Sequence, residues 1–353
     1  MDPNSRIDYA DAIRAFAITS VVFLHVASPI AQSPGTFPAA WWWIANAVYS
    51  CARPSIALFV MVSGLLLLSP SKEEGIGFFL RKRFVKIAVP FIGWGIIYFF
   101  WKTHMQVSPR GFVRLAREFV EGPVYYHLWF IYTIAGIYLA TPVFRVYVKN
   151  ASRSNQAYLL LLWIIGTSVY PVIRHFSGIN VGIPILVAGG FLGAFLLGNF
   201  LRPFQAGTRS GLWLGLLAAL CLGFTAVSEY FLSSRLVGAY DGTFEDFLSP
   251  NVVAAATCIF LIIKSLPLET LRRRVPVLNK IMAGVSGASF SIYLMHILVL
   301  EILKGHVPGV VIDGCFIHPV VGIPVTAVGT IAVCVFVTLV MRRVPVVRQM
   351  FPS

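Results

Sequence analysis

An arginine and a histidine lie eleven residues apart in the first long apolar segment of the chain, as Arg14 and His25 in ADAIRAFAITSVVFLHVAS. Eleven residues make about three turns of an α-helix, so the two side chains share one face about 16 Å apart along its axis. Asp11 lies one turn before Arg14 and can pair with its guanidinium. An ionisable group in a membrane helix costs roughly 2.5–3.5 kcal/mol and commonly marks a substrate or ion path. The spacing indicates such a path, with His25 suited to proton transfer.

Each of these residues also has a purely structural interpretation. Arg14 could extend to the lipid headgroups while it pairs with Asp11. His25 could be a buried histidine that hydrogen-bonds to a neighbouring helix. The two interpretations stay open at the level of the individual residue.

A second membrane-length segment, SFSIYLMHILVLEIL, carries His296 at about the same depth as His25. Tyr293 and Ser289 lie one and two turns before His296, on the same helical face. The two histidines could therefore face one cavity, and Tyr293 could position a reacting group there. Hydrogen bonding between helices is the alternative role for His296.

Three further residues are candidates for substrate binding at the opposite, outer membrane surface. His127 and Trp129 begin the segment HLWFIYTIAGIYLATPVFR, and Arg53 precedes the apolar segment PSIALFVMVSGLLLL. Trp129 alone is weak evidence, because tryptophan is common at membrane interfaces. Ser63 and Gly64, near the other end of the Arg53 segment, permit close approach of a neighbouring helix.

A basic stretch, FFLRKRFVKIAVPF, carries Arg81, Lys82, Arg83 and Lys86 before Pro90. Such a stretch is typical of cytoplasmic loops. Four cations at a helix entrance would also suit a polyanion such as coenzyme A, because arginine and lysine bind phosphates. The sequence contains neither of the glycine-rich nucleotide fingerprints.

The elements that must position these residues are membrane-spanning helices. Of the 353 residues, 58% are hydrophobic and only 12% are charged, whereas soluble domains carry about 25% charged residues. The composition predicts an all-α, polytopic protein in a lipid bilayer. The net charge of +14 follows from basic cytoplasmic loops, so we expect no nucleic-acid partner. The five cysteines have no metal-ligand spacing, so we expect no metal.

Ten apolar stretches are long enough to cross about 30 Å of hydrocarbon. They are residues 12–31, 53–69, 84–101, 127–148, 157–173, 182–200, 211–232, 250–266, 282–303 and 320–341. The aromatic stretch 39–51 is too short to cross and predicts an interfacial or re-entrant helix. The loops on the N-terminal side hold 19 of the 28 lysines and arginines, which places both termini in the cytoplasm. Residues 1–353 are expected to form one transmembrane domain without a soluble domain.

At these residues the chain resembles the acyltransferase-3 family of integral membrane acyltransferases. The resemblance covers the whole chain and rests on five motifs in order. They are Arg14 and His25; Phe59, Ser63 and Gly64; Arg83 and Lys86 before Pro90; His127 and Trp129 with Tyr138 and Pro142; and Tyr293 with His296. The chain is most similar to stand-alone bacterial O-acetyltransferases that modify surface polysaccharides, of the enterobacterial common antigen type. Two departures are Ala15, where the family often has glycine, and Lys86, where arginine is common.

The resemblance implies transfer of an acyl group, usually acetyl, from cytoplasmic acetyl-CoA or another acyl-CoA. The acceptor would be a hydroxyl of an extracytoplasmic or lipid-linked glycan at a bacterial inner membrane. Arg81, Arg83 and Lys86 would hold phosphates, and Arg14, oriented by Asp11, would anchor or guide the donor. Ser63 would be a further residue of the donor-binding site. His25 would be the general base or a transient acyl carrier. His296, Tyr293 and His127 would position the acceptor or the oxyanion. Association into a homo-oligomer is left open.

Two other functions fit the same residues. A transporter or flippase for a polysaccharide precursor or acyl donor would also place arginine and histidine inside the membrane. Transporters often carry inverted repeats, and none is evident in this sequence. A structural subunit of a polysaccharide-assembly complex would use the histidines for packing, so that loss of His25 would leave glycan acylation intact.

Overall fold

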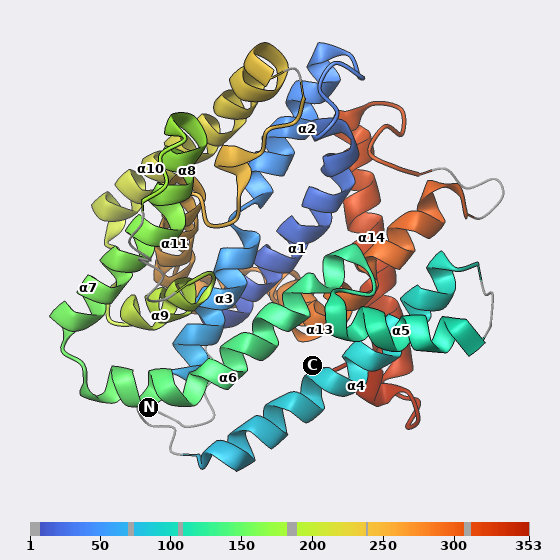
Figure 1. Cartoon of the computed structure of the whole chain (residues 1–353), viewed down its shortest axis with the longest axis horizontal. Helices are drawn as coiled ribbons and strands as arrows, with labels where there is room; N and C mark the ends of the chain where they lie inside the picture. The colour runs from blue at the N-terminus through green and yellow to red at the C-terminus, as the bar shows by residue number, and fades with distance from the viewer. Residues whose placement is uncertain are drawn as a thin grey trace.

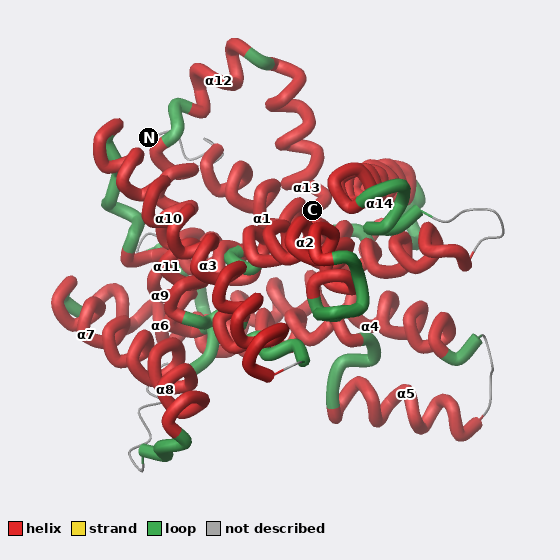
Figure 2. The backbone as a smooth tube through the Cα atoms, turned by 90° about the horizontal axis from the view of Figure 1, so that it is seen from above, coloured by secondary structure: helices red, strands yellow, loops and turns green. Residues whose placement is uncertain are grey.

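In the computed structural model, residues 8–69, 74–104, 109–181, 189–237, 239–306 and 312–352 are described. Figure 1 shows a bundle of helices in several directions, and Figure 2 shows helices joined by loops, with no strand in the described part of the chain. The longer helices are α1 (Asp8–Ala31), α2 (Ala39–Ala52), α3 (Ser55–Leu67), α4 (Ile76–Lys102), α5 (Pro109–Glu121), α6 (Trp129–Asn150), α7 (Arg153–Trp163), α10 (Thr208–Glu229), α11 (Pro250–Ser265), α13 (Pro276–Glu301) and α14 (Pro319–Met341). The shorter ones are α8 (Tyr170–Ser177), α9 (Leu192–Phe200) and α12 (Leu268–Arg274), with single turns η1 (Tyr126–Leu128), η4 (Thr243–Glu245) and η6 (Arg348–Met350), and wide π turns η2 (Ile164–Val169), η3 (Tyr230–Val237) and η5 (Ile302–His306).

Helix α1 lies at the centre of the bundle. It packs against α2, α3, α11, α13 and α14, and Figure 1 shows it surrounded by these helices. Ile13, Ile18 and Val22 of α1 are fully buried, because a helix covered on most sides must be apolar around most of its circumference. We call the end of the bundle where α1, α4 and α13 begin the near end, and the opposite end the far end.

Nine apolar helical segments in the described residues are long enough to cross a membrane. Eight of them coincide with the expected spans, with boundaries that differ by a few residues, except that α4 and α13 begin earlier, at Ile76 and Pro276. The expected span 182–200 lies partly outside the described residues, which show its second half as α9. The fold is therefore the polytopic all-α bundle that the composition predicts.

The ninth segment, Ala39–Leu67, joins the expected interfacial helix 39–51 to the expected second span. Helix α3 alone has 13 residues, or about 20 Å, which is too short to cross 30 Å of hydrocarbon. Helices α2 and α3 both pack along α1, and Arg53 and Pro54 form the break between them. The two short helices thus form one interrupted apolar segment, whereas the interfacial position of 39–51 stays a prediction.

Helices α3 and α9 cross at very short distance through two glycines. A Cβ atom on Gly64 would lie 1.7 Å from the carbonyl oxygen of Phe195, and one on Gly198 would lie 1.9 Å from that of Met61. Only glycine allows two backbones to approach so closely. The crossing confirms that Gly64 serves close helix packing, and it fixes α3, which carries Ser63, in the bundle.

Candidate active site

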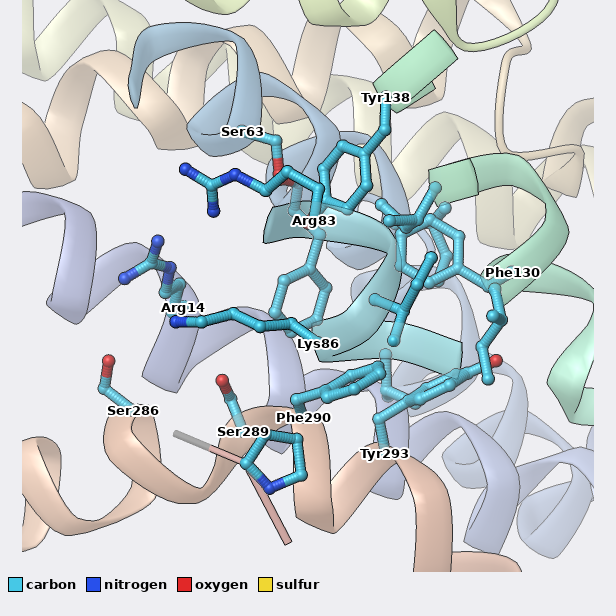
Figure 3. A pocket seen from close by; sticks show the side chains of 17 residues that line it. Arg14, Ser63, Arg83, Lys86, Phe130, Tyr138, Ser286, Ser289, Phe290 and Tyr293 are labelled. Carbon is cyan, nitrogen blue, oxygen red and sulfur yellow. The ribbon is translucent and has the colours of Figure 1, made fainter. Parts of the chain in front are cut away.

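A cavity of about 250 Å³ opens at the near end, between α1, α3, α4, α6 and α13. Figure 3 shows that its lining has two parts. The basic side chains of Arg14, Arg83 and Lys86 converge at one end, and the rings of Phe130 and Tyr293 lie at the other. The cavity can therefore bind a molecule that is anionic at one end and apolar along its length.

The basic end of the cavity is built from two helices. Arg14 comes from α1, and Arg83 and Lys86 lie about one turn apart on α4. The guanidinium of Arg83 lies 5.9 Å from the centre of the Tyr138 ring, and its buried Nε has no hydrogen-bond partner within the described residues. Like charges that converge repel each other unless an anion lies among them, so this end favours a polyanionic ligand.

Asp11 orients the arginine of α1 in the way its spacing predicts. Its carboxylate accepts a hydrogen bond from Arg14 Nη1 at 3.3 Å and another from Ser286 Oγ at 2.9 Å. Because Ser286 belongs to α13, Asp11 connects α1 to α13 beside the cavity. Asp11 thus acts on the cavity through Arg14 and Ser286.

Other basic side chains near this end are paired with Glu74. Lys82 Nζ lies 3.0 Å from the Glu74 carboxylate, and Arg145 lies 3.6 Å from it. The hydrogen bond from Lys82 holds the pKa of the Glu74 carboxyl below its usual value. Lys82 and Arg145 therefore form a separate ion-pair group, and the cations that face the cavity are Arg14, Arg83 and Lys86.

Three histidines from three elements meet beyond the apolar end of the cavity. The ring centres of His25 and His296 are 5.1 Å apart, and those of His127 and His296 are 5.4 Å apart. His296 is fully buried, His127 is 3% exposed, and His25 is partly exposed. Among the described residues, no group of three His, Cys, Asp or Glu side chains is arranged to hold a metal ion. The histidines thus form a compact group for hydrogen bonding or proton transfer.

Backbone contacts select the protonated nitrogen in two of these rings. His296 Nδ1 lies 3.0 Å from the carbonyl oxygen of Ile292 and 2.8 Å from that of Tyr293. His127 Nε2 lies 3.4 Å from the carbonyl oxygen of Leu294. Because carbonyl oxygens only accept hydrogen bonds, these nitrogens carry the proton in the neutral rings. His296 Nε2 and His127 Nδ1 are then unprotonated, and in the described residues neither has a hydrogen-bond partner.

Tyrosines hold the histidine group against α13. Tyr293 donates a hydrogen bond to the carbonyl oxygen of His127 at 2.6 Å. Tyr98 donates to the carbonyl oxygen of Leu294 at 2.9 Å, and its ring lies 4.8 Å from that of His127. These contacts dock η1, which carries His127, onto the helix that carries His296. Tyr293 thus has a positioning role in addition to lining the cavity.

A second, smaller cavity of about 50 Å³ touches His25, His127 and Trp129. Four residues, Val21, Ile56, Phe130 and Tyr293, line both cavities. These four side chains, which we call the partition, lie between the basic end and the histidines. Helix α1 contributes to both cavities, with Arg14 lining the larger one and His25 the smaller one.

Four predicted residues line neither cavity. Asp11 and His296 contact residues that do, and the other two are Arg81 and Arg53. Arg81 is exposed and does not line the larger cavity, because residues two positions apart on a helix, such as Arg81 and Arg83, do not face the same way. Arg53 is buried and lines neither cavity. Its guanidinium lies 4.5 Å from the ring centre of Phe247, which stacks on Trp129 at the smaller cavity. Arg53 therefore contacts the smaller cavity only indirectly, through Phe247 and Trp129.

Several residues that line the cavities were not predicted from the sequence. Phe247 and Pro352 come from segments far along the chain, and only the fold brings them to the two cavities. Ser286 is different, because it precedes Tyr293 by two turns on α13. The helical spacing that places Tyr293 and Ser289 on one face also places Ser286 there, so Ser286 could have been predicted from the sequence.

A comparison with known families finds a match. Residues 7–339 match the acyltransferase-3 family, described as an acyltransferase domain. Neither a curated protein nor a solved structure gives a significant match. The family match extends over nearly the whole chain, including all three histidines and the basic end of the larger cavity.

Proposed function

Because the chain belongs to the acyltransferase-3 family of membrane acyltransferases, we propose that it moves an acyl group, acetyl above all, from cytoplasmic acyl-CoA to a hydroxyl of an extracytoplasmic or lipid-linked polysaccharide. One observation carries the proposal. The two cavities share the partition, with cations at one end and His25 and His127 at the other, where the ring of His296 lies beside both of theirs. That arrangement suits a donor that enters from one membrane side and an acceptor that enters from the other.

In this proposal the near end faces the cytoplasm of a bacterial cell, at the inner membrane, in agreement with the excess of lysine and arginine in the loops on that side. Arg14, Arg83 and Lys86 bind the phosphates of coenzyme A, because guanidinium and ammonium groups form charge-assisted hydrogen bonds with phosphate. The uncharged pantetheine arm then extends along the apolar wall. Arg14 and His25 are about 16 Å apart along α1, so an extended arm is needed to bring the thioester towards the histidines.

The chemistry takes place beside the histidine group. The acceptor hydroxyl oxygen attacks the thioester carbonyl carbon, and His25 takes the hydroxyl proton as general base. The carbon–sulfur bond then breaks, and the coenzyme A thiolate takes that proton from His25 as it leaves, which returns His25 to its neutral form. His296 Nε2 lies on the neighbouring ring with its tautomer fixed by Nδ1, so it is a hydrogen-bond acceptor beside His25. His127 and Trp129 contact the acceptor from the far end.

The test is acyl transfer by the purified protein in lipid vesicles. Radiolabelled acetyl-CoA and the lipid-linked polysaccharide of the source cell are supplied, and label in the glycan is counted. His25→Ala is expected to reduce the turnover number about 10²-fold or more while acetyl-CoA still binds. His175→Ala is the matched control, because His175 is exposed and lies outside both cavities. If the wild-type protein neither hydrolyses nor transfers the acetyl group, and His25→Ala leaves the native polymer unchanged, the proposal fails.

A further inference from the structure

The segment that follows α14, residues 342–352, folds back into the bundle at the near end. Both Figure 1 and Figure 2 place the end of the chain beside α13. Phe351 is 7% exposed, and its ring packs edge-on against Trp94 of α4 at 5.6 Å. Trp94 Nε1 also donates a hydrogen bond to the carbonyl oxygen of Met350 at 3.1 Å. The segment is therefore held firmly against α4.

Arg342 fastens the same segment to α13. Its Nε donates to the carbonyl oxygen of Phe351 at 2.8 Å, and its Nη2 donates to those of Pro352 at 2.6 Å and Gly287 at 2.8 Å. Ser291 of α13 adds a hydrogen bond from its Oγ to the Pro352 carbonyl oxygen at 3.1 Å. A guanidinium with three carbonyl acceptors fixes their relative positions, because its donors have a rigid planar arrangement.

These hydrogen bonds place Pro352 in the wall of the larger cavity. Pro352 lines that cavity together with Ser286 and Ser289 of α13. We infer that Pro352, held in place by the segment that follows α14, forms a wall of the donor cavity and contacts the pantetheine arm of the bound acyl-CoA, and that Arg342 is the positioning residue of that wall. The inference rests on the proposed function, since it assigns the donor to this cavity.

The segment also connects the two helices that carry the opposite ends of the donor site. Helix α4 bears Arg83 and Lys86, and α13 bears Tyr293. At α4 the contact is close, because a Cβ atom on Gly93 would lie 2.6 Å from the end of the Met350 side chain. The segment thus connects α4 to α13 beside the larger cavity.

The test separates the two halves of the donor. Binding of acetyl-CoA and of adenosine 3′,5′-bisphosphate, the nucleotide part without pantetheine, is measured by titration calorimetry on the full chain in detergent. For Arg342→Ala we expect about tenfold weaker binding of acetyl-CoA, because Pro352 is no longer held against the pantetheine arm, and unchanged binding of the nucleotide. Arg342→Lys should recover part of the affinity. Arg343→Ala is the matched control, because Arg343 is the next residue and is exposed.

A second variant keeps the test decisive if Arg342→Ala does not fold. Pro352→Trp keeps Arg342 and the carbonyl groups it binds, but it places a larger side chain in the cavity. It should also weaken binding of acetyl-CoA and leave binding of the nucleotide unchanged. The inference is overturned if the variants bind acetyl-CoA as tightly as the wild type, or if they lose both ligands in parallel. If the wild-type protein binds neither ligand, the proposed function fails, and this inference fails with it.

Discussion

Arg81 and Arg83 provide a direct comparison of two arginines on one helix. Arg83 lines the larger cavity, whereas Arg81 is exposed on the opposite side of α4. We expect Arg83→Ala to weaken acetyl-CoA binding about ten- to hundredfold, because it removes a charge-assisted contact with phosphate. Arg81→Ala should bind the donor normally. Equal effects of the two substitutions in a binding titration would show that the basic stretch acts only through its total charge.

His296 gives a second prediction at the residue scale. Its Nδ1 is engaged by two carbonyl oxygens, so only Nε2 is left to interact with other groups. His296→Ala should lower the turnover number at least tenfold and leave the KM for acetyl-CoA within about twofold, because a group beside the acceptor acts mainly in the transition state. Steady-state kinetics with radiolabelled acetyl-CoA measure both values. A raised KM with an unchanged turnover number would assign His296 to donor binding instead.

Spacing within a single helix predicts a large part of the candidate site. Arg14, His25 and Tyr293 all line the cavities, because helical periodicity determines which side chains share a face. The contacts of Phe247 and Pro352 could not be predicted in this way, since tertiary packing brings their segments to the site. Helical periodicity also explains why Arg81 does not line the cavity. Arg81 and Arg83 lie in the same basic stretch, but residues two positions apart on a helix point in different directions.

At the scale of helices, the crossing of α3 and α9 depends on its two glycines. Gly198→Ala would place a Cβ atom 1.9 Å from the Met61 carbonyl oxygen. We expect it to lower the free energy of unfolding by about 1–3 kcal/mol or more, because the backbones must separate. Thermal unfolding in detergent measures the effect. Gly215→Ala on α10, where the added Cβ would contact nothing within 4 Å, should be neutral or stabilising, and a similar loss there would contradict the explanation.

The boundaries of the helices were predicted less well than their existence. The hydropathy of the sequence predicts that the span in α4 begins at residue 84, whereas the helix begins at Ile76. The first turns of α4 carry Arg81 and Arg83, and charged residues lower the average hydropathy without ending a helix. The break at Arg53 and Pro54 was also visible in the sequence, but only packing of α2 and α3 along α1 shows that the two helices form one interrupted segment.

At the scale of the whole molecule, the orientation in the membrane is the main prediction. The near end should face the cytoplasm, because most of the lysines and arginines lie in loops on that side. Alkaline phosphatase, which is active only outside the cytoplasm, should be active when fused after Gly178 in the far-end loop that follows α8. It should be inactive when fused after Gln205, in the near-end loop before α10. The reverse pattern would invert the donor and acceptor sides of the proposed reaction.

The partition has an electrical consequence for the cell. In the proposed reaction the two cavities open to opposite sides of the membrane and shorten its insulating part, so the transmembrane voltage would fall mainly across Val21, Ile56, Phe130 and Tyr293. Each unit charge in that field changes in energy by about 2.3 kcal/mol per 100 mV, whereas a neutral acyl group is hardly affected. These four uncharged side chains would let an enzyme work across the membrane without conducting protons. Replacement of Ile56 by glycine should therefore increase proton leakage in vesicles.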